Sequence, residues 1–159
     1  MTRVLIHAVD IWQREEALAR TTVAWGLASV VAGLGLVAGT RAPGRRSFGL
    51  QTTGWGAVDL GIAAVSLRLQ TRRMRRLPDP YAAPAQEGER RKLQRILLVN
   101  AAADVGYVAL GLKMAGDSRP RVSGAGVAIV LQGAFLLLHD SFHALGCAKD
   151  RQVEGPAVR

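Results

Sequence analysis

The sequence predicts an all-α integral membrane protein, a four-helix bundle with a short N-terminal amphipathic interfacial helix. Charged residues make up 21% of the chain and hydrophobic residues 49%, but the charges are segregated between long apolar stretches. Stretches of this length can cross about 30 Å of hydrocarbon as helices. Glycine is abundant, with 18 residues, while aromatic residues account for only 5%. Small residues allow close helix packing in a bilayer, whereas they weaken a soluble core.

A chain of 159 residues is long enough for one domain. We divide it into an N-terminal amphipathic segment (1–20), a four-helix domain (21–146) and a polar tail (147–159). The predicted spans are residues 21–39, 48–67, 96–112 and 122–146. Cys147 is the only cysteine, which excludes an intrachain disulfide.

The N-terminal segment carries an apolar stripe at helical spacing that ends at Trp12. This pattern favours a helix on the membrane surface with Trp12 at the interface. The alternative is a plain helical extension of the first span.

A basic connector, residues 68–95, separates the second and third spans. Pro78, Pro80 and Pro84 are expected to break helical structure there and to leave the connector partly disordered. The short loops 40–47 and 113–121 each join antiparallel neighbours.

Basic residues indicate an orientation. Fifteen of the 21 lie in the N-terminal segment, the connector and the tail. The positive-inside bias therefore predicts a multi-pass protein with both termini and the connector in the cytoplasm. Abundant Ala, Gly and Arg with only three Lys is typical of a GC-rich bacterial genome, so we expect the inner (cytoplasmic) membrane.

An arginine cluster directly follows the second span, and we expect its members to contact anionic lipid headgroups. The cluster consists of Arg68, Arg72, Arg73, Arg75 and Arg76. It lacks the interleaved aromatic residues that stack on bases, so nucleic acid is not an expected partner. A homo-oligomer or a larger membrane complex stays open.

Polar residues inside the spans form the candidate site. Counted along the helix rise from the cytoplasmic end, Asp59, Asp104, His139 and Asp140 share one level, at about 9–12 Å depth. Further polar residues lie on the inward faces of the same helices. They are Asn100, Tyr107, Gln132 and His143.

Three carboxylates at one depth need compensation, because an isolated charge there costs about 3 kcal/mol or more. Protonation, a histidine cation or a bound cation would each supply it. The sequence therefore predicts a site for a proton, a metal ion or a small polar ligand, formed by Asp59, Asn100, Asp104, Tyr107, Gln132 and Asp140. His139 and His143, at i and i+4, together with Asp104 are candidate ligands of a divalent metal.

The alternative function is a structural or accessory membrane subunit whose polar layer only fixes helix packing. Catalysis is not expected, because the chain has no HExxH, serine-nucleophile or phosphate-loop motif. A soluble four-helix bundle is the fallback for the fold.

Three segments carry a resemblance to a known family. They are FGLQTTGWGAVD, LLVNAAADVGYVALG and GAGVAIVLQGAFLLLHDSFHAL. They resemble WGxxN, NxxxDxxY and QGxxLxxxDxxH in small bacterial four-span membrane proteins with no assigned function, over roughly residues 20–146. The matching positions are Trp55, Gly56, Asn100, Asp104, Tyr107, Gln132, Gly133, Asp140 and His143. The chain departs from the pattern at Asp59, where the family pattern has Asn, and at His139, where it has an apolar residue. The resemblance implies four membrane helices and supplies no activity.

Overall fold

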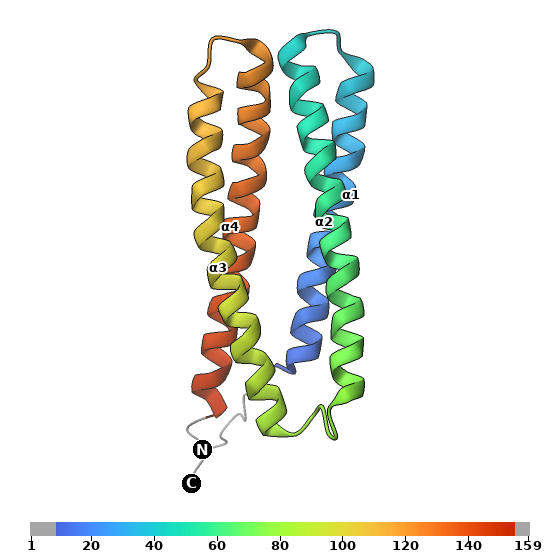
Figure 1. Cartoon of the computed structure of the whole chain (residues 1–159), viewed down its shortest axis with the longest axis vertical. Helices are drawn as coiled ribbons and strands as arrows, with labels where there is room; N and C mark the ends of the chain where they lie inside the picture. Colours follow the sequence, from blue (N-terminus) through green and yellow to red (C-terminus); the bar gives the residue numbers. More distant parts are fainter. Residues whose placement is uncertain (1–8, 155–159) are drawn as a thin grey trace, which may run out of the picture.

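The computed structural model describes residues 9–154, with side chains as far as Asp150. These residues form four long helices, and none of them lies in a strand (Figure 1). The helices are α1 (Ile11–Gly39), α2 (Pro43–Arg76), α3 (Ala83–Ala115) and α4 (Pro120–Glu154). The all-α helical bundle is therefore confirmed.

The bundle consists of two helical hairpins, α1 with α2 and α3 with α4 (Figure 1). The hairpins meet mainly where α2 packs against α4, and α2 and α3 make almost no backbone contact with each other. The α2–α3 link lies at the end where α1 begins and α4 ends, here called the link end. The two short loops lie at the opposite end, the loop end.

Glycines set the distance between α1 and α2. A Cβ atom added at Gly56 would lie 2.6 Å from the carbonyl oxygen of Gly26, and one added at Gly33 would lie 2.6 Å from that of Gly49. Each helix thus presents two glycines seven residues apart to its partner, because seven residues are about two helical turns. Backbones this close leave no room for any larger residue.

The other helical glycines fall into two groups, one in contact with a neighbouring helix and one exposed. Gly111 of α3 meets α4 closely, with an added Cβ 2.8 Å from the backbone nitrogen of Val130. An added Cβ at Gly54, Gly61 or Gly106 would meet nothing within 4 Å. Only part of the glycine content therefore serves helix contact.

The expected disorder of the connector 68–95 is wrong. α2 continues to Arg76 and α3 begins at Ala83, so only residues 77–82 link them. Pro84 lies in the first turn of α3 and does not break the helix, because the backbone N–H that proline lacks would be unpaired in the first turn anyway. Arginine favours helix, which lets α2 run on through its basic end.

No break separates the described part of segment 1–20 from the first predicted span. Residues 11–20 are the first turns of α1, the second of the two interpretations, since no helix breaker precedes the span. Residues 1–8 lie outside the described part. Trp12 is only 3% exposed and donates from Nε1 to the carbonyl of Pro80, so its expected place at a membrane interface is wrong. The tail is helical to Glu154.

A folded cap closes the link end. Its apolar core consists of Ile11, Trp12, Leu93, Leu97, Ala144 and Cys147. Within the cap, two glutamines join α2 and α3 to the start of α1. Gln70 of α2 donates to the carbonyl of Trp12, and Gln86 of α3 accepts from the backbone N–H of Ile11. These long-range bonds join α1, α2 and α3 where the helices would otherwise separate.

Arg73 connects three helices of the cap. Its guanidinium donates to Glu15 of α1 at 2.7 Å and to Glu89 of α3 at 2.7 Å, and it lies over the ring of Trp12. Both glutamates are largely buried. Burial raises the pKa of the Glu15 carboxyl, while the charge and hydrogen bond of Arg73 oppose that rise.

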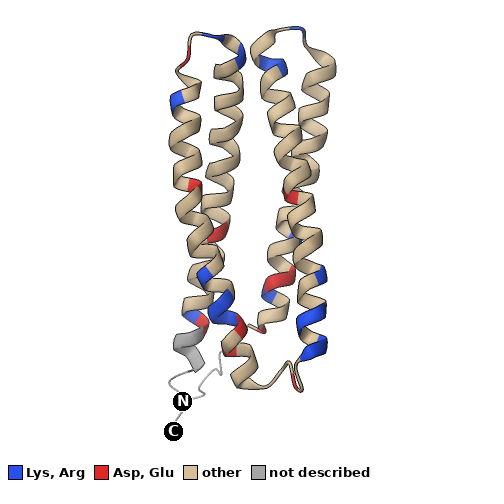
Figure 2. Ribbon diagram, viewed as in Figure 1, with Lys and Arg blue, Asp and Glu red and all other residues tan. Residues whose placement is uncertain are grey.

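Three helices, α1, α3 and α4, are long and apolar enough to cross a membrane. α2 does not reach the same apolarity, since polar residues such as Gln51, Thr52 and Asp59 interrupt it. Lys and Arg gather at the two ends of the bundle, and the middle of the helices carries only a few acidic positions (Figure 2).

We predict that Gly56→Ala lowers the free energy of unfolding by about 1–3 kcal/mol, because its methyl group meets the backbone of α1. Gly54→Ala is the matched control on the same helix, and it should leave stability unchanged or raise it by up to about 1 kcal/mol. Titration with SDS in detergent micelles measures both. Equal stability of the two variants would contradict the close α1–α2 contact.

We predict that Arg73→Gln destabilises the cap by about 2 kcal/mol, less than a fully buried pair would lose, because Arg73 is a third exposed. Without Arg73 the folded-state pKa of Glu15 rises further above its unfolded value, so protonation favours the folded state. The loss should therefore be largest at neutral pH and shrink as the pH falls. Arg76→Gln, at an exposed position, is the control, and a pH-independent loss would contradict the proposed ion pairs.

Candidate functional site

A cavity of about 730 Å³ lies between α2 and α3, with side chains of α4 and α1 behind it. We call it the α2–α3 cleft. Its volume falls within the range of about 300–1,000 Å³ that is common for small-molecule sites. It exists because α2 packs against α1 and α4 and leaves α3 almost untouched.

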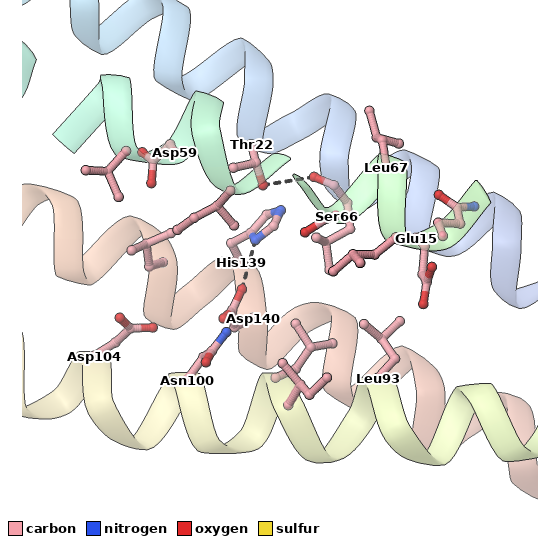
Figure 3. A pocket seen from close by; sticks show the side chains of 18 of the residues that line it. Glu15, Thr22, Asp59, Ser66, Leu67, Leu93, Asn100, Asp104, His139 and Asp140 are labelled. Atoms are coloured by element: carbon pink, nitrogen blue, oxygen red, sulfur yellow. Dashed lines mark hydrogen bonds and ion pairs between the residues drawn. The ribbon is translucent and has the colours of Figure 1, made fainter. Parts of the chain in front are cut away.

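Three carboxylates from three helices face the inner part of the cleft (Figure 3). Asp59 of α2 is 1% exposed, Asp104 of α3 is 5% exposed and Asp140 of α4 is 6% exposed. Asp104 lies close enough to the other two to interact with both electrostatically. No Lys or Arg lines this inner part, since the arginines that line the cleft all come from positions 72–76 of α2.

Asp59 is held by a chain of hydrogen bonds. Trp25 donates from Nε1 to Oε1 of Gln132 at 2.8 Å, and Gln132 donates from Nε2 to Oδ2 of Asp59 at 2.7 Å. Trp25 also stacks on Phe135, with ring centroids 4.0 Å apart. This chain joins α1, α4 and α2 and gives Asp59 a structural partner.

Asp104 and His139 differ from Asp59 in this respect. Oδ2 of Asp104 and Nε2 of His139 are buried and have no hydrogen-bond partner among the described residues. Nδ1 of His139 donates to Oδ1 of Asp140 at 3.1 Å. Buried polar atoms without partners are rare and costly in folded proteins. Two residues that line the cleft, one on α3 and one on α4, therefore carry buried polar atoms without a partner among the described residues.

An aromatic pair borders the cleft on the side of the loop end. Trp55 of α2 and Tyr107 of α3 line the cleft and meet edge to face, with centroids 5.4 Å apart. Nε1 of Trp55 is a further buried donor without a partner. The pair is one of the few places where side chains of α2 and α3 touch.

At the link end the cleft is basic. Arg72 and Arg76 line it together with Arg73, whose charge is already paired with glutamates. Arg72 lies 13 residues along α2 from Asp59, which corresponds to about 20 Å of helix. The cleft thus has an acidic inner part and a basic mouth, with mainly apolar walls between them.

Most of the site residues predicted from the sequence line this one cleft. They are Asp59, Asn100, Asp104, Tyr107, His139 and Asp140. Gln132 does not line it but holds Asp59 from behind. His143 does not line it either; its ring lies against that of His139, with centroids 4.8 Å apart.

The metal hypothesis gains no support from this geometry. Within the part of the chain that the structure describes, no three His, Cys, Asp or Glu side chains are grouped so that they could hold a metal ion. His139 turns Nδ1 to Asp140, while His143 lies outside the cleft, so His139, His143 and Asp104 do not converge on one point.

The five arginines predicted at the membrane surface have different surroundings. Four are exposed at the link end: Arg68, Arg72, Arg75 and Arg76. Arg73 points inward to Glu15 and Glu89. Nothing in the sequence marks Arg73 as the exception, because its partners come from distant segments.

Sequence reasoning missed the pairing of Trp25 with Gln132 and several polar residues near the link end that line the cleft. Thr22, Ser66 and Gln70 line the cleft or its mouth. The signal for Trp25 was weak: it shares a face of α1 with Ser29 and Gly33, which shows that this face is inward but not what it meets.

Comparison with known proteins identifies a family but no function. The family of unknown function DUF6992 matches residues 21–141. No curated protein and no solved structure matches the chain. The match covers most of the segment in which the sequence resembled uncharacterised membrane proteins; the bacterial origin and four spans of that resemblance stay predictions.

We predict that Gln132→Met, which keeps the side-chain length, lowers the free energy of unfolding by about 1–3 kcal/mol, because it leaves Trp25 Nε1 and Asp59 Oδ2 unpaired. Gln51→Met on α2 is the control, since Gln51 makes no hydrogen bond with the described residues. SDS titration measures both. If the two substitutions had the same effect, the hydrogen-bond chain would not hold the bundle.

Proposed function

Since the chain belongs to a family of unknown function (DUF6992), we propose its function from the site alone: it is an integral membrane protein whose α2–α3 cleft binds a small ligand. Asp104, Asp140 and His139 are the residues that meet the ligand. The observation that carries the proposal is Asp104, which lines a cavity large enough for a small molecule and whose buried Oδ2 has no hydrogen-bond partner among the described residues.

The membrane part of the proposal rests on the outer surface of the bundle. Large apolar side chains face outward along all four helices; on α4 alone, Leu138, Phe142 and Leu145 are 72%, 72% and 71% exposed. Monomeric soluble proteins rarely expose apolar patches of this extent. α2 supplies the fourth span, with the polar residues that lower its apolarity turned toward α1, α4 and the cleft.

The orientation follows from the basic residues. The link end carries most of them, and α1 begins and α4 ends there. The positive-inside bias then puts the link end in the cytoplasm of a bacterial cell, with the exposed arginines of α2 against anionic headgroups. The folded cap, with its ion pairs, suits the aqueous side of that boundary.

Binding accounts for the polar layer better than a purely structural role. A layer that only fixed helix packing would have its polar groups paired, as Asp59 is with Gln132. Asp104 and His139 line the same cavity, and each keeps a buried polar atom without a partner among the described residues. Binding sites commonly keep such groups at a cost in stability.

We predict that Asp104→Leu leaves the free energy of unfolding unchanged or raises it by about 1 kcal/mol, because it removes a buried carboxyl oxygen that has no hydrogen-bond partner among the described residues. Asp59→Leu, the matched substitution on α2, should lower it, because Gln132 loses its acceptor. SDS titration compares the two. A loss of more than about 1 kcal/mol in Asp104→Leu would favour the alternative, a structural or accessory subunit.

A further inference from the structure

We propose that the ligand of the α2–α3 cleft is an organic cation with an apolar body, and that it enters sideways from the hydrocarbon layer between α2 and α3. This inference rests on the proposed binding function and adds a ligand class and an entry route to it. Charge, wall composition and the position of the opening each contribute to the argument.

The charge of the inner cleft calls for a cation. Three carboxylates face it, and every Lys or Arg that lines the cleft lies on α2, about 20 Å or more along the helix from Asp59. Carboxylates in an apolar surrounding are stabilised by an opposite charge that comes with its own hydrogen-bond donors. Trp55 and Tyr107 add aromatic rings beside the carboxylates, which organic cations favour and hydrated metal ions do not need.

The walls of the cleft suit an apolar body. Between the carboxylates and the arginines, the lining comes mainly from aliphatic side chains of α2 and α3, among them Ile62, Leu69 and Ile96. Ile62 is 57% exposed and Ile96 55% exposed. A small inorganic cation would leave this apolar surface uncovered, whereas a larger organic one would cover it.

The position of the opening favours entry from the bilayer. α2 and α3 make almost no backbone contact, and Ile62 and Ile96, which line the cleft from these two helices, are both more than half exposed, so the cleft opens between them. The end of the cleft toward water carries Arg72 and Arg76, which repel a cation approaching from that side. A cation that enters from the hydrocarbon layer between α2 and α3 does not pass these two arginines.

The matched ions tetraphenylphosphonium and tetraphenylborate test the proposal, because they have nearly the same size and shape and opposite charge. The protein is reconstituted in phosphatidylcholine nanodiscs, and equilibrium dialysis measures bound ion against nanodiscs without protein. We expect saturable binding of tetraphenylphosphonium, weakened at least tenfold in Asp104→Asn. Asp117→Asn, in the α3–α4 loop, should bind like the wild type. Saturable, Asp104-dependent binding of tetraphenylborate instead would overturn the proposal.

A pair of neighbouring alanines tests the place of binding. Ala103 lines the cleft and is exposed to it, whereas Ala102 is exposed but does not line it. Ala103→Phe should fill the cleft and abolish the binding of tetraphenylphosphonium, and Ala102→Phe should leave it unchanged. Equal effects would overturn the assignment of the ion to this cleft.

A third ion separates this inference from the proposed function. Tetramethylammonium carries the same charge on a small body that stays in water. If it bound in an Asp104-dependent manner while tetraphenylphosphonium did not, the apolar body and the sideways entry would be wrong and the binding site would stand. If neither cation bound and Asp104→Leu also destabilised the protein, both the inference and the proposed function would fall.

Discussion

The structure depends on how tightly α2 is held against two of its neighbours. Gly26 and Gly33 of α1 meet Gly56 and Gly49 of α2 backbone to backbone. At the loop end an added Cβ at Gly124 would lie 2.0 Å from the carbonyl oxygen of Gly44, so α2 and α4 touch as closely there. α2 thus lies close to α1 and α4, and it makes almost no backbone contact with α3. The cleft lies in the space between α2 and α3.

Pairing then divides the polar layer into two parts with different roles. The chain from Trp25 through Gln132 to Asp59 is complete and joins three helices. Asp104 comes from α3, whose backbone α2 hardly contacts, and its Oδ2 has no comparable partner among the described residues. The cleft and a buried carboxyl oxygen without a partner thus occur where the backbones of α2 and α3 are apart. A structural layer and a binding site need not be alternatives for the whole set of residues.

Much of this arrangement could be predicted from the sequence, because it follows from helical periodicity. The rise and turn of a helix were enough to bring Asp59, Asp104 and Asp140 to one level on inward faces. Periodicity could not show which partners would meet. Gln132 was assigned to the site, yet it holds Asp59 from behind, and Arg73 was assigned to the membrane surface, yet it pairs with Glu15 and Glu89.

The cap was the main structural feature that sequence reasoning did not find. Pro84 was read as a helix breaker, although a proline in the first turn begins a helix as readily as a proline in the interior ends one. Trp12 was placed at a lipid interface because its amphipathic ring suits one. The carbonyl of Pro80 supplies the partner instead, and it lies 68 residues away in the chain, too far for a local sequence pattern to show.

The central claim is that the cleft opens to lipid between α2 and α3, and a nitroxide label at Ala103→Cys tests it most directly. The buried Cys147 is replaced by alanine, and the protein is reconstituted in liposomes. Collision rates with oxygen, which concentrates in hydrocarbon, are compared with those of a water-soluble nickel complex. We expect oxygen to collide with the label far more often than the nickel complex does, and the reverse for a label at Gly116 in the α3–α4 loop. Preferential collision with the nickel complex at position 103, or no collision with either, would contradict the account.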